Sequence, residues 1–124
     1  SNIPAVSFTF NSIKILFDTA DEYSHSWFYP RCRNGKIHEP AATSIFVNNI
    51  NKNDCVLDIG AHLGYFTCIS SFLAPQGSVH AFEVNPKCIP LIKKNVNINN
   101  FNNVLLKLNY SLYYLIYSIY QKFH

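Results

Sequence analysis

The chain has 124 residues, of which 48% are hydrophobic and 14% charged, and its formal net charge is +3. This length allows one modest domain with a real core, and the composition excludes a disordered protein. The basic residues are scattered, apart from the pair Lys93 and Lys94 and the close pair Arg31 and Arg33. Because a nucleic-acid footprint needs a clustered basic stripe, we expect a solvated surface and no nucleic-acid partner.

Neither the four cysteines nor the five histidines have the spacing of a metal site, so we expect no metal. Three of the cysteines lie in apolar runs, where a free thiol behaves as a small hydrophobic residue. Reduced cysteines predict a cytoplasmic location. We find no signal-peptide pattern, and the most apolar window, residues 112–120, is too short to span a membrane.

The first 38 residues predict a β-hairpin followed by a loop. Residues 5–17 alternate apolar and polar side chains on both sides of Asn11 and Ser12, which is typical of two strands joined by a polar turn. Residues 18–35 mix polar and aromatic side chains and predict a loop with about one helical turn. We expect residues 1–38 to form an N-terminal hairpin and loop.

The middle of the chain, residues 39–112, alternates predicted helices and buried strands. Ile45 and Phe46 fall on one face of the first helix, and Pro90 would cost a hydrogen bond near the start of the last helix. Alternation of this kind predicts parallel strands with right-handed crossovers and helices packed on the sheet. Helices are expected over residues 39–54, 65–74 and 85–100, and strands over residues 55–60, 78–84 and 103–110.

The last segment, residues 113–124, is rich in tyrosine and isoleucine. Tyr113, Ile116 or Tyr117, and Tyr120 would share one face of a helix, but the β-propensity of the segment is just as high. Helix and strand therefore both stay open for this tail.

The sequence VLDIGAHLGYFT, residues 56–67, predicts a binding loop. Asp58 ends a buried strand, and Gly60, His62 and Gly64 follow before the next helix. In an open parallel sheet, ligands bind beyond the carboxyl ends of the strands, and glycines there let the backbone approach a ligand closely. Glu83 ends the next strand beside this loop, where a carboxylate can accept hydrogen bonds from ribose hydroxyls. Together these residues predict an adenosine-type ligand.

The charge of Asp58 narrows the choice of ligand. This carboxylate would repel a pyrophosphate, and His62 stands where the dinucleotide fingerprint has a glycine, so NAD is the weaker alternative. A ligand with an ammonium or sulfonium charge suits Asp58, and S-adenosylmethionine carries both charges and a ribose. We therefore predict S-adenosylmethionine as the cofactor, bound by Asp58, Gly60, His62, Gly64 and Glu83.

The sequences VLDIGAHLGYFT and VHAFEVNP resemble motifs one and two of the class I S-adenosylmethionine-dependent methyltransferases. More narrowly, they resemble the FkbM-type family, whose motifs are D-x-G-A-N-x-G-x-x-T and A-F-E-P-x-P, although His62 replaces the usual asparagine and Val84 the usual proline. The resemblance covers about residues 36–112 and implies a Rossmann-like α/β sheet. It places Asp58 near the methionine amino group and Glu83 on the ribose, and it implies methyl transfer to a hydroxyl of a small molecule or sugar.

A complete class I methyltransferase sheet has further strands beyond the three expected here, so the resemblance implies a truncated cofactor-binding half. One hypothesis is an O-methyltransferase; the alternative is a catalytically inactive cofactor-binding or structural fragment. We assign no catalytic residue, because loop and helix-start roles explain His62 and Glu39 at least as well as catalytic ones. The first strand of the motif would become a sheet edge. Three arrangements stay open: residues 113–124 cover this edge, a second copy covers it in a homo-oligomer, or nothing covers it.

Overall fold

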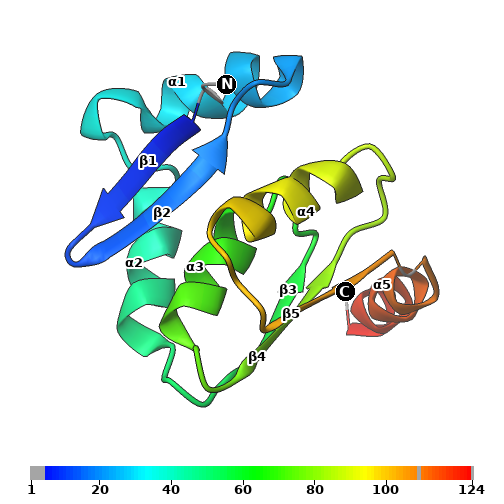
Figure 1. The fold of residues 1–124 in the computed structure, drawn as a ribbon. Helices are drawn as coiled ribbons and strands as arrows, with labels where there is room; N and C mark the ends of the chain where they lie inside the picture. The colour runs from blue at the N-terminus through cyan, green and yellow to red at the C-terminus, as the bar shows by residue number, and fades with distance from the viewer. Residues whose placement is uncertain (1–4, 109, 124) are drawn as a thin grey trace.

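The computed structural model describes residues 5–108 and 110–123 (Figure 1). The expected fold class, a Rossmann-like parallel α/β sheet preceded by a hairpin and a helix, is confirmed. The strands are β1 (Ala5–Phe10), β2 (Ile13–Asp18), β3 (Cys55–Ile59), β4 (Ser78–Phe82) and β5 (Val104–Lys107). The helices are the π-helix η1 (Ser24–Phe28), α1 (Tyr29–Cys32), the 3-10 helix η2 (Arg33–Gly35), α2 (Pro40–Asn49), α3 (Tyr65–Leu73), α4 (Ile89–Ile98) and α5 (Tyr110–Phe123).

The protein has three layers, with helices between the N-terminal hairpin and the parallel sheet (Figure 1). β1 and β2 pair antiparallel around Asn11, whose φ of 53° suits a hairpin turn. The sheet has the order β3-β4-β5 with all strands parallel, so β4 is central and β3 is an edge. Because the expected β-α-β-α-β order is present, the carboxyl ends of β3 and β4 lie side by side.

Helix α3 lies in the middle layer and is buried on nearly every side. Cys68, Ile69 and Ser70 are fully buried, as expected for a helix with neighbours on opposite faces. At its start, the Tyr65 ring packs against Phe8 at a centroid distance of 5.5 Å, and against Phe17 and Phe28 at 5.7 Å each. This aromatic core joins the hairpin to the sheet layer. The boundaries expected at residues 38 and 112 stay predictions.

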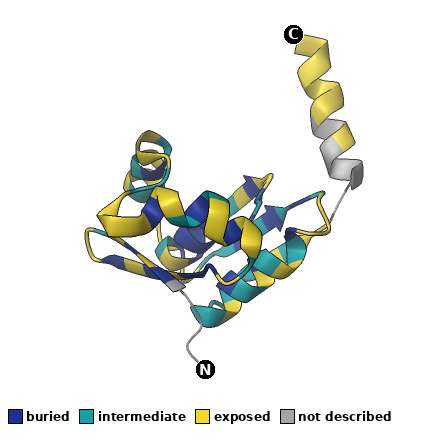
Figure 2. Ribbon diagram, turned by 90° about the horizontal axis from the view of Figure 1, so that it is seen from above, coloured by how far each residue is buried: buried dark blue, intermediate teal, exposed yellow. Residues whose placement is uncertain are grey.

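Strand β3 is not the fully buried strand that its apolar sequence predicts. Its register with β4 places Leu57 and Ile59 on the face opposite α3 and α4, where they are 59% and 50% exposed. The tail forms a helix, α5, which stands away from the body of the protein in Figure 2. The part of the tail that the structure describes therefore leaves the β3 edge uncovered. Among the described helices, none is long and apolar enough to cross a membrane.

Two helical segments differ from the sequence expectation. Residues 24–35 form three short consecutive helices rather than a loop, because Phe28 is drawn fully into the aromatic core. Helix α4 begins at Ile89 rather than near Asn85, whose side-chain oxygen instead accepts the Lys87 N–H at 3.0 Å in a turn. Pro90 therefore falls in the first helical turn, where a missing N–H costs no internal hydrogen bond.

The prediction of which residues α2 buries is wrong in part. Ile45 is 63% exposed, whereas Phe46 packs against the core and Thr43 is fully buried. The Thr43 hydroxyl donates to the carbonyl of His38 at 2.7 Å and lies 2.9 Å from the Tyr65 hydroxyl. A polar network, rather than an apolar stripe alone, thus anchors the start of this helix.

Two asparagines, one in α4 and one directly after its end, connect the hairpin to the rest of the fold. Asn95 is buried; its side chain accepts the Asp18 N–H and donates to the Leu63 carbonyl, both at 2.8 Å. One turn later, the Asn99 side chain makes the same pair of bonds to the backbone of Leu16, again at 2.8 Å. The free edge of β2 is therefore paired by amide side chains, and Asn95 also holds the loop before α3.

Replacing Asn95 by alanine should lower the free energy of unfolding by about 2–4 kcal/mol, because it leaves a buried N–H and a buried carbonyl without partners. Urea unfolding followed by circular dichroism measures the change. Asn97→Ala, at an exposed position of the same helix, is the matched control and should cost less than about 0.5 kcal/mol. Equal effects of the two substitutions would contradict this bridging role.

Candidate functional site

The loop between β3 and α3 depends on three residues with positive φ. Gly60, His62 and Gly64 have φ values of 80°, 59° and 94°. Glycine adopts this region freely, and histidine and asparagine enter it more readily than most other residues. This explains how His62 can replace the asparagine of related motifs without changing the path of the loop.

Glu83 follows β4 and holds this loop from the neighbouring strand. One oxygen of its carboxylate accepts the His62 N–H at 2.7 Å, and the other accepts the N–H groups of Val84 at 2.8 Å and Asn85 at 2.9 Å. The carbonyl of Phe82 accepts the N–H groups of the two residues that begin the loop, at 2.9 and 3.0 Å. Glu83 is 7% exposed, and since a carboxylate offers about four acceptor positions, about one remains free.

Asp58 ends β3 and is 8% exposed. Its carboxylate accepts a hydrogen bond of 2.5 Å from the Thr67 hydroxyl in α3. Burial raises the pKa of Asp58 above its ordinary value, the Thr67 hydrogen bond opposes that shift, and the nearby negative charge of Glu83 adds to it. The site therefore holds a carboxylate whose negative charge is poorly compensated.

A pocket of about 540 Å³ opens beside this loop. Of the predicted site residues, Asp58, Gly60 and His62 line it, whereas Gly64 precedes α3 and Glu83 is hydrogen-bonded to the loop without lining the pocket. Other lining residues come from η1, from the segment before α2 and from the first turn of α3. They include Trp27, His38, Glu39, Tyr65 and Phe66.

Several residues in and around this pocket have no clear signal in the sequence. The edge of His62 packs on Tyr23 and Trp27, each at a centroid distance of 5.1 Å, and the Tyr23 hydroxyl is hydrogen-bonded to Nε2 of His62. The only sequence signal for this aromatic wall is the high aromatic content of residues 18–35. Thr67 had a clearer signal, because it occupies the threonine position of the D-x-G-A-N-x-G-x-x-T motif.

An acid at the end of one strand, a loop with positive φ values and a second acid after the next strand define a Rossmann-like site of the class I methyltransferase kind. The chain belongs to the TRM5/TYW2 methyltransferase domain family, which matches residues 37–112. This match confirms the class I superfamily and, at the level of the family, S-adenosylmethionine as the cofactor.

Individual relatives agree with the family. Over 55 residues, the chain is 34% identical to the tRNA(Phe) (4-demethylwyosine(37)-C(7)) aminocarboxypropyltransferase of Methanocaldococcus jannaschii, an alignment that covers 44% of this chain and 22% of that protein. The structure of M. jannaschii TYW2 with AdoMet gives a TM-score of 0.56 at 20% identity over 87% of this chain and 44% of that one. A putative rRNA-methylase from Clostridium thermocellum gives a TM-score of 0.54 at 21% identity over 56% and 40%. These two structures share the fold, and the chain spans only part of each relative.

Two expectations need correction. The branch is TRM5/TYW2 rather than FkbM-type, because the family model that matches residues 37–112 is that of the TRM5/TYW2 domain. The two motifs resemble those of the class I superfamily as a whole, so they do not separate its branches. The expectation of no nucleic-acid partner is also wrong, because the curated relative is a tRNA(Phe)-modifying enzyme. The comparisons do not show the small-molecule acceptor that the resemblance implied. The basic residues looked scattered along the sequence, but Arg31 and Lys36 meet around one hollow in the structure.

The positive φ of His62 makes a specific prediction. His62→Val should destabilise the protein by about 1–2 kcal/mol, because a side chain with a branched β-carbon is strained in the left-handed region. His62→Asn also removes the imidazole but accepts this φ, and it should cost clearly less. Paired thermal and urea unfolding curves compare the two variants. If His62→Asn cost as much as His62→Val, the ring contacts rather than the backbone would decide what residue is tolerated.

The raised pKa of Asp58 makes a second prediction, on stability. The penalty for a buried charge is absent below the pKa of the unfolded state and complete above the raised pKa of the folded state. Asp58→Asn should therefore stabilise the ligand-free protein near pH 7, and its advantage should shrink as the pH falls through the pKa of Asp58. Unfolding at pH 4 to 7 measures this, with exposed Glu22→Gln as the control for losing one negative charge. A difference in the free energy of unfolding between Asp58→Asn and the natural chain that does not vary with pH would contradict this prediction.

Proposed function

We propose that this chain is the S-adenosylmethionine-binding part of a tRNA-modifying transferase. The observation that carries the proposal is Asp58: a nearly buried carboxylate, with its pKa raised, lining a pocket beside a glycine loop. A pocket of about 540 Å³ falls within the range of roughly 300–1,000 Å³ usual for small-molecule sites. Family membership supports the same cofactor.

Residues of the pocket and of the loop beside it fit the methionine and ribose parts of this cofactor. Asp58 would hold the cationic methionine end, since an opposite charge nearby favours the ionised carboxylate that burial disfavours. Gly60 and His62 would let the loop backbone lie close to the cofactor, and the start of α3 at Gly64 would present free N–H groups to it. Glu83 would accept one ribose hydroxyl with its remaining acceptor position while it still holds the loop.

S-adenosylmethionine supplies, when bound, an activated carbon on a positively charged sulfur. The chain's own contribution would be to orient this cofactor and to exclude water with the aromatic wall of Trp27, Tyr65 and Phe66. Glu39 also lines the pocket, and its side chain is 57% exposed beside His38. It is therefore the carboxylate best placed to meet an incoming acceptor.

The relatives support RNA as the acceptor, and tRNA in particular, through the curated enzyme that shares 34% identity. That enzyme transfers an aminocarboxypropyl group. This group is therefore the second candidate, beside methyl, for the group that is transferred to the RNA. Incubation of a tRNA transcript with S-adenosylmethionine labelled either in the methyl carbon or in the methionine α-carbon separates the two reactions. The family name favours label from the methyl carbon.

Titration calorimetry tests the cofactor directly. We expect S-adenosylmethionine and S-adenosylhomocysteine to bind more tightly than NAD, because Asp58 repels a pyrophosphate. Asp58→Asn and Glu83→Gln should each weaken binding by roughly 10- to 100-fold, the range expected for a lost charged hydrogen bond.

Glu22→Gln, at an exposed site outside the pocket, is the matched carboxylate-to-amide control and should bind normally. Since Asp58→Asn is expected to be more stable than the natural chain, its loss of binding cannot be attributed to unfolding. Tighter binding of NAD, or binding that neither substitution weakens, would overturn the proposed function.

A further inference from the structure

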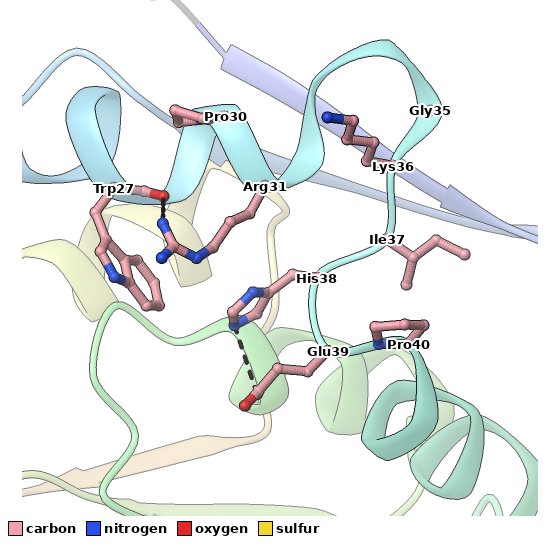
Figure 3. Close-up of a pocket in the computed structure, with 9 residues that line it drawn as sticks. All are labelled: Trp27, Pro30, Arg31, Gly35, Lys36, Ile37, His38, Glu39 and Pro40. Atoms are coloured by element: carbon pink, nitrogen blue, oxygen red, sulfur yellow. Dashed lines mark hydrogen bonds and ion pairs between the residues drawn. The ribbon is translucent and has the colours of Figure 1, made fainter.

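A second hollow adjoins the cofactor pocket on the side of the segment that precedes α2 (Figure 3). Its volume is about 790 Å³, and Trp27, His38 and Glu39 line both hollows. Arg31 and Lys36 line only the second one. We propose that this second hollow, called here the acceptor pocket, receives one unstacked nucleotide of an RNA substrate, with its base on the Arg31 guanidinium and its phosphate near Lys36. The inference rests on the proposed function and names the acceptor site for it.

The geometry of Arg31 suits it to stacking. Its guanidinium carbon lies 4.4 Å from the centroid of the Trp27 ring, and one of its nitrogens donates to the Trp27 carbonyl. Tyr23 stacks on Trp27 at a centroid distance of 5.8 Å and an interplanar angle of 16°, so the support beneath Arg31 is itself packed. Proteins that bind unpaired RNA bases stack them on aromatic rings or on arginine planes. An exposed arginine held over a ring in this way provides such a plane.

The charge around the acceptor pocket fits a phosphodiester. Arg31 and Lys36 are both exposed, and a single N–H of Arg31 is used in its bond to Trp27, which leaves donors for a ligand. Among the described residues that line the hollow, Glu39 is the one acid, and it also lines the cofactor pocket. The positive side of the pocket is therefore the side away from the cofactor, as a strand of RNA entering from outside requires.

The position of Glu39 makes the two pockets continuous. Its φ of 44° is left-handed, a conformation that is uncommon for residues other than glycine. Backbone strain of this kind concentrates at functional sites, where the surrounding structure maintains it. Shared walls at Trp27, His38 and Glu39 would bring an atom of the bound base to the border of the cofactor pocket, which group transfer needs.

The chain provides its own reporter for this pocket, because Trp27 is its only tryptophan. The experiment titrates the full chain with an unmodified tRNA(Phe) transcript, follows tryptophan emission, and corrects for RNA absorption with free tryptophan. In the natural chain we expect a saturable change in emission. Arg31→Ala should weaken binding by roughly tenfold, in keeping with the loss of one stacked base. Arg31→Lys keeps the charge but loses the plane and should weaken binding several-fold.

Arg33→Ala is the matched control, because Arg33 is an exposed arginine two residues away that does not line the pocket. It should change the affinity by less than about twofold, and circular dichroism checks that each variant is folded. Equal losses for Arg31→Ala and Arg33→Ala would show a merely electrostatic contact and overturn the inference. Binding of fluorescein-labelled RNA, detected by anisotropy, without a change in Trp27 emission would overturn it too.

Calorimetry with S-adenosylmethionine on the same samples separates the two proposals. Normal cofactor binding in all variants, with no RNA signal from Trp27, rejects the acceptor pocket and leaves the cofactor assignment intact. An Arg31-dependent RNA signal without cofactor binding rejects the proposed function and leaves the nucleotide site intact.

Discussion

The geometry of the site depends on the hydrogen bonds that the carboxylate of Glu83 accepts. It collects N–H groups from His62, Val84 and Asn85, and so joins the loop after β3 to the end of β4. Charged hydrogen bonds of this kind are worth about 1.5–3 kcal/mol each, more than neutral ones. They hold a loop whose positive φ values are otherwise easy for only a few residue types. A side chain predicted to serve a ligand thus also builds the site that receives it.

The same arrangement leaves Asp58 in an unfavourable position. It lies close enough to Glu83 for their charges to repel, and among the described residues no lysine or arginine pairs with either acid. Lys94 forms its ion pair with Asp18, at 3.1 Å. The nearly buried carboxylate of Asp58, which has no cation beside it, therefore lowers the stability of the ligand-free protein, and a cationic ligand would reduce that penalty. The site is therefore better matched to a positively charged cofactor than to none.

The sequence predicted the parts of this structure that local pattern and strand topology decide. The hairpin turn at Asn11, the alternation of helices and strands and the approach of Glu83 to the glycine loop all follow from spacing. It did not predict the helices between residues 24 and 35, because the burial of Phe28 against Tyr65 is a tertiary contact with no local signal. It also missed the convergence of Trp27, Arg31 and Lys36, since a pocket built from one irregular segment shows no periodicity. The expectation of no nucleic acid rested on basic residues that are scattered along the sequence, and the tRNA-modifying relative contradicts it.

The most direct test of the central claim is the pKa of Asp58, measured by ¹³C NMR of its labelled carboxyl group with and without saturating S-adenosylmethionine. Burial predicts a pKa above the ordinary value in the free protein. If Asp58 faces the cationic end of the cofactor, the bound cofactor should lower that pKa, and the affinity should fall as the pH drops through the pKa of the free protein. A pKa that is the same in both states, in a sample where calorimetry shows the cofactor to be bound, would contradict the account.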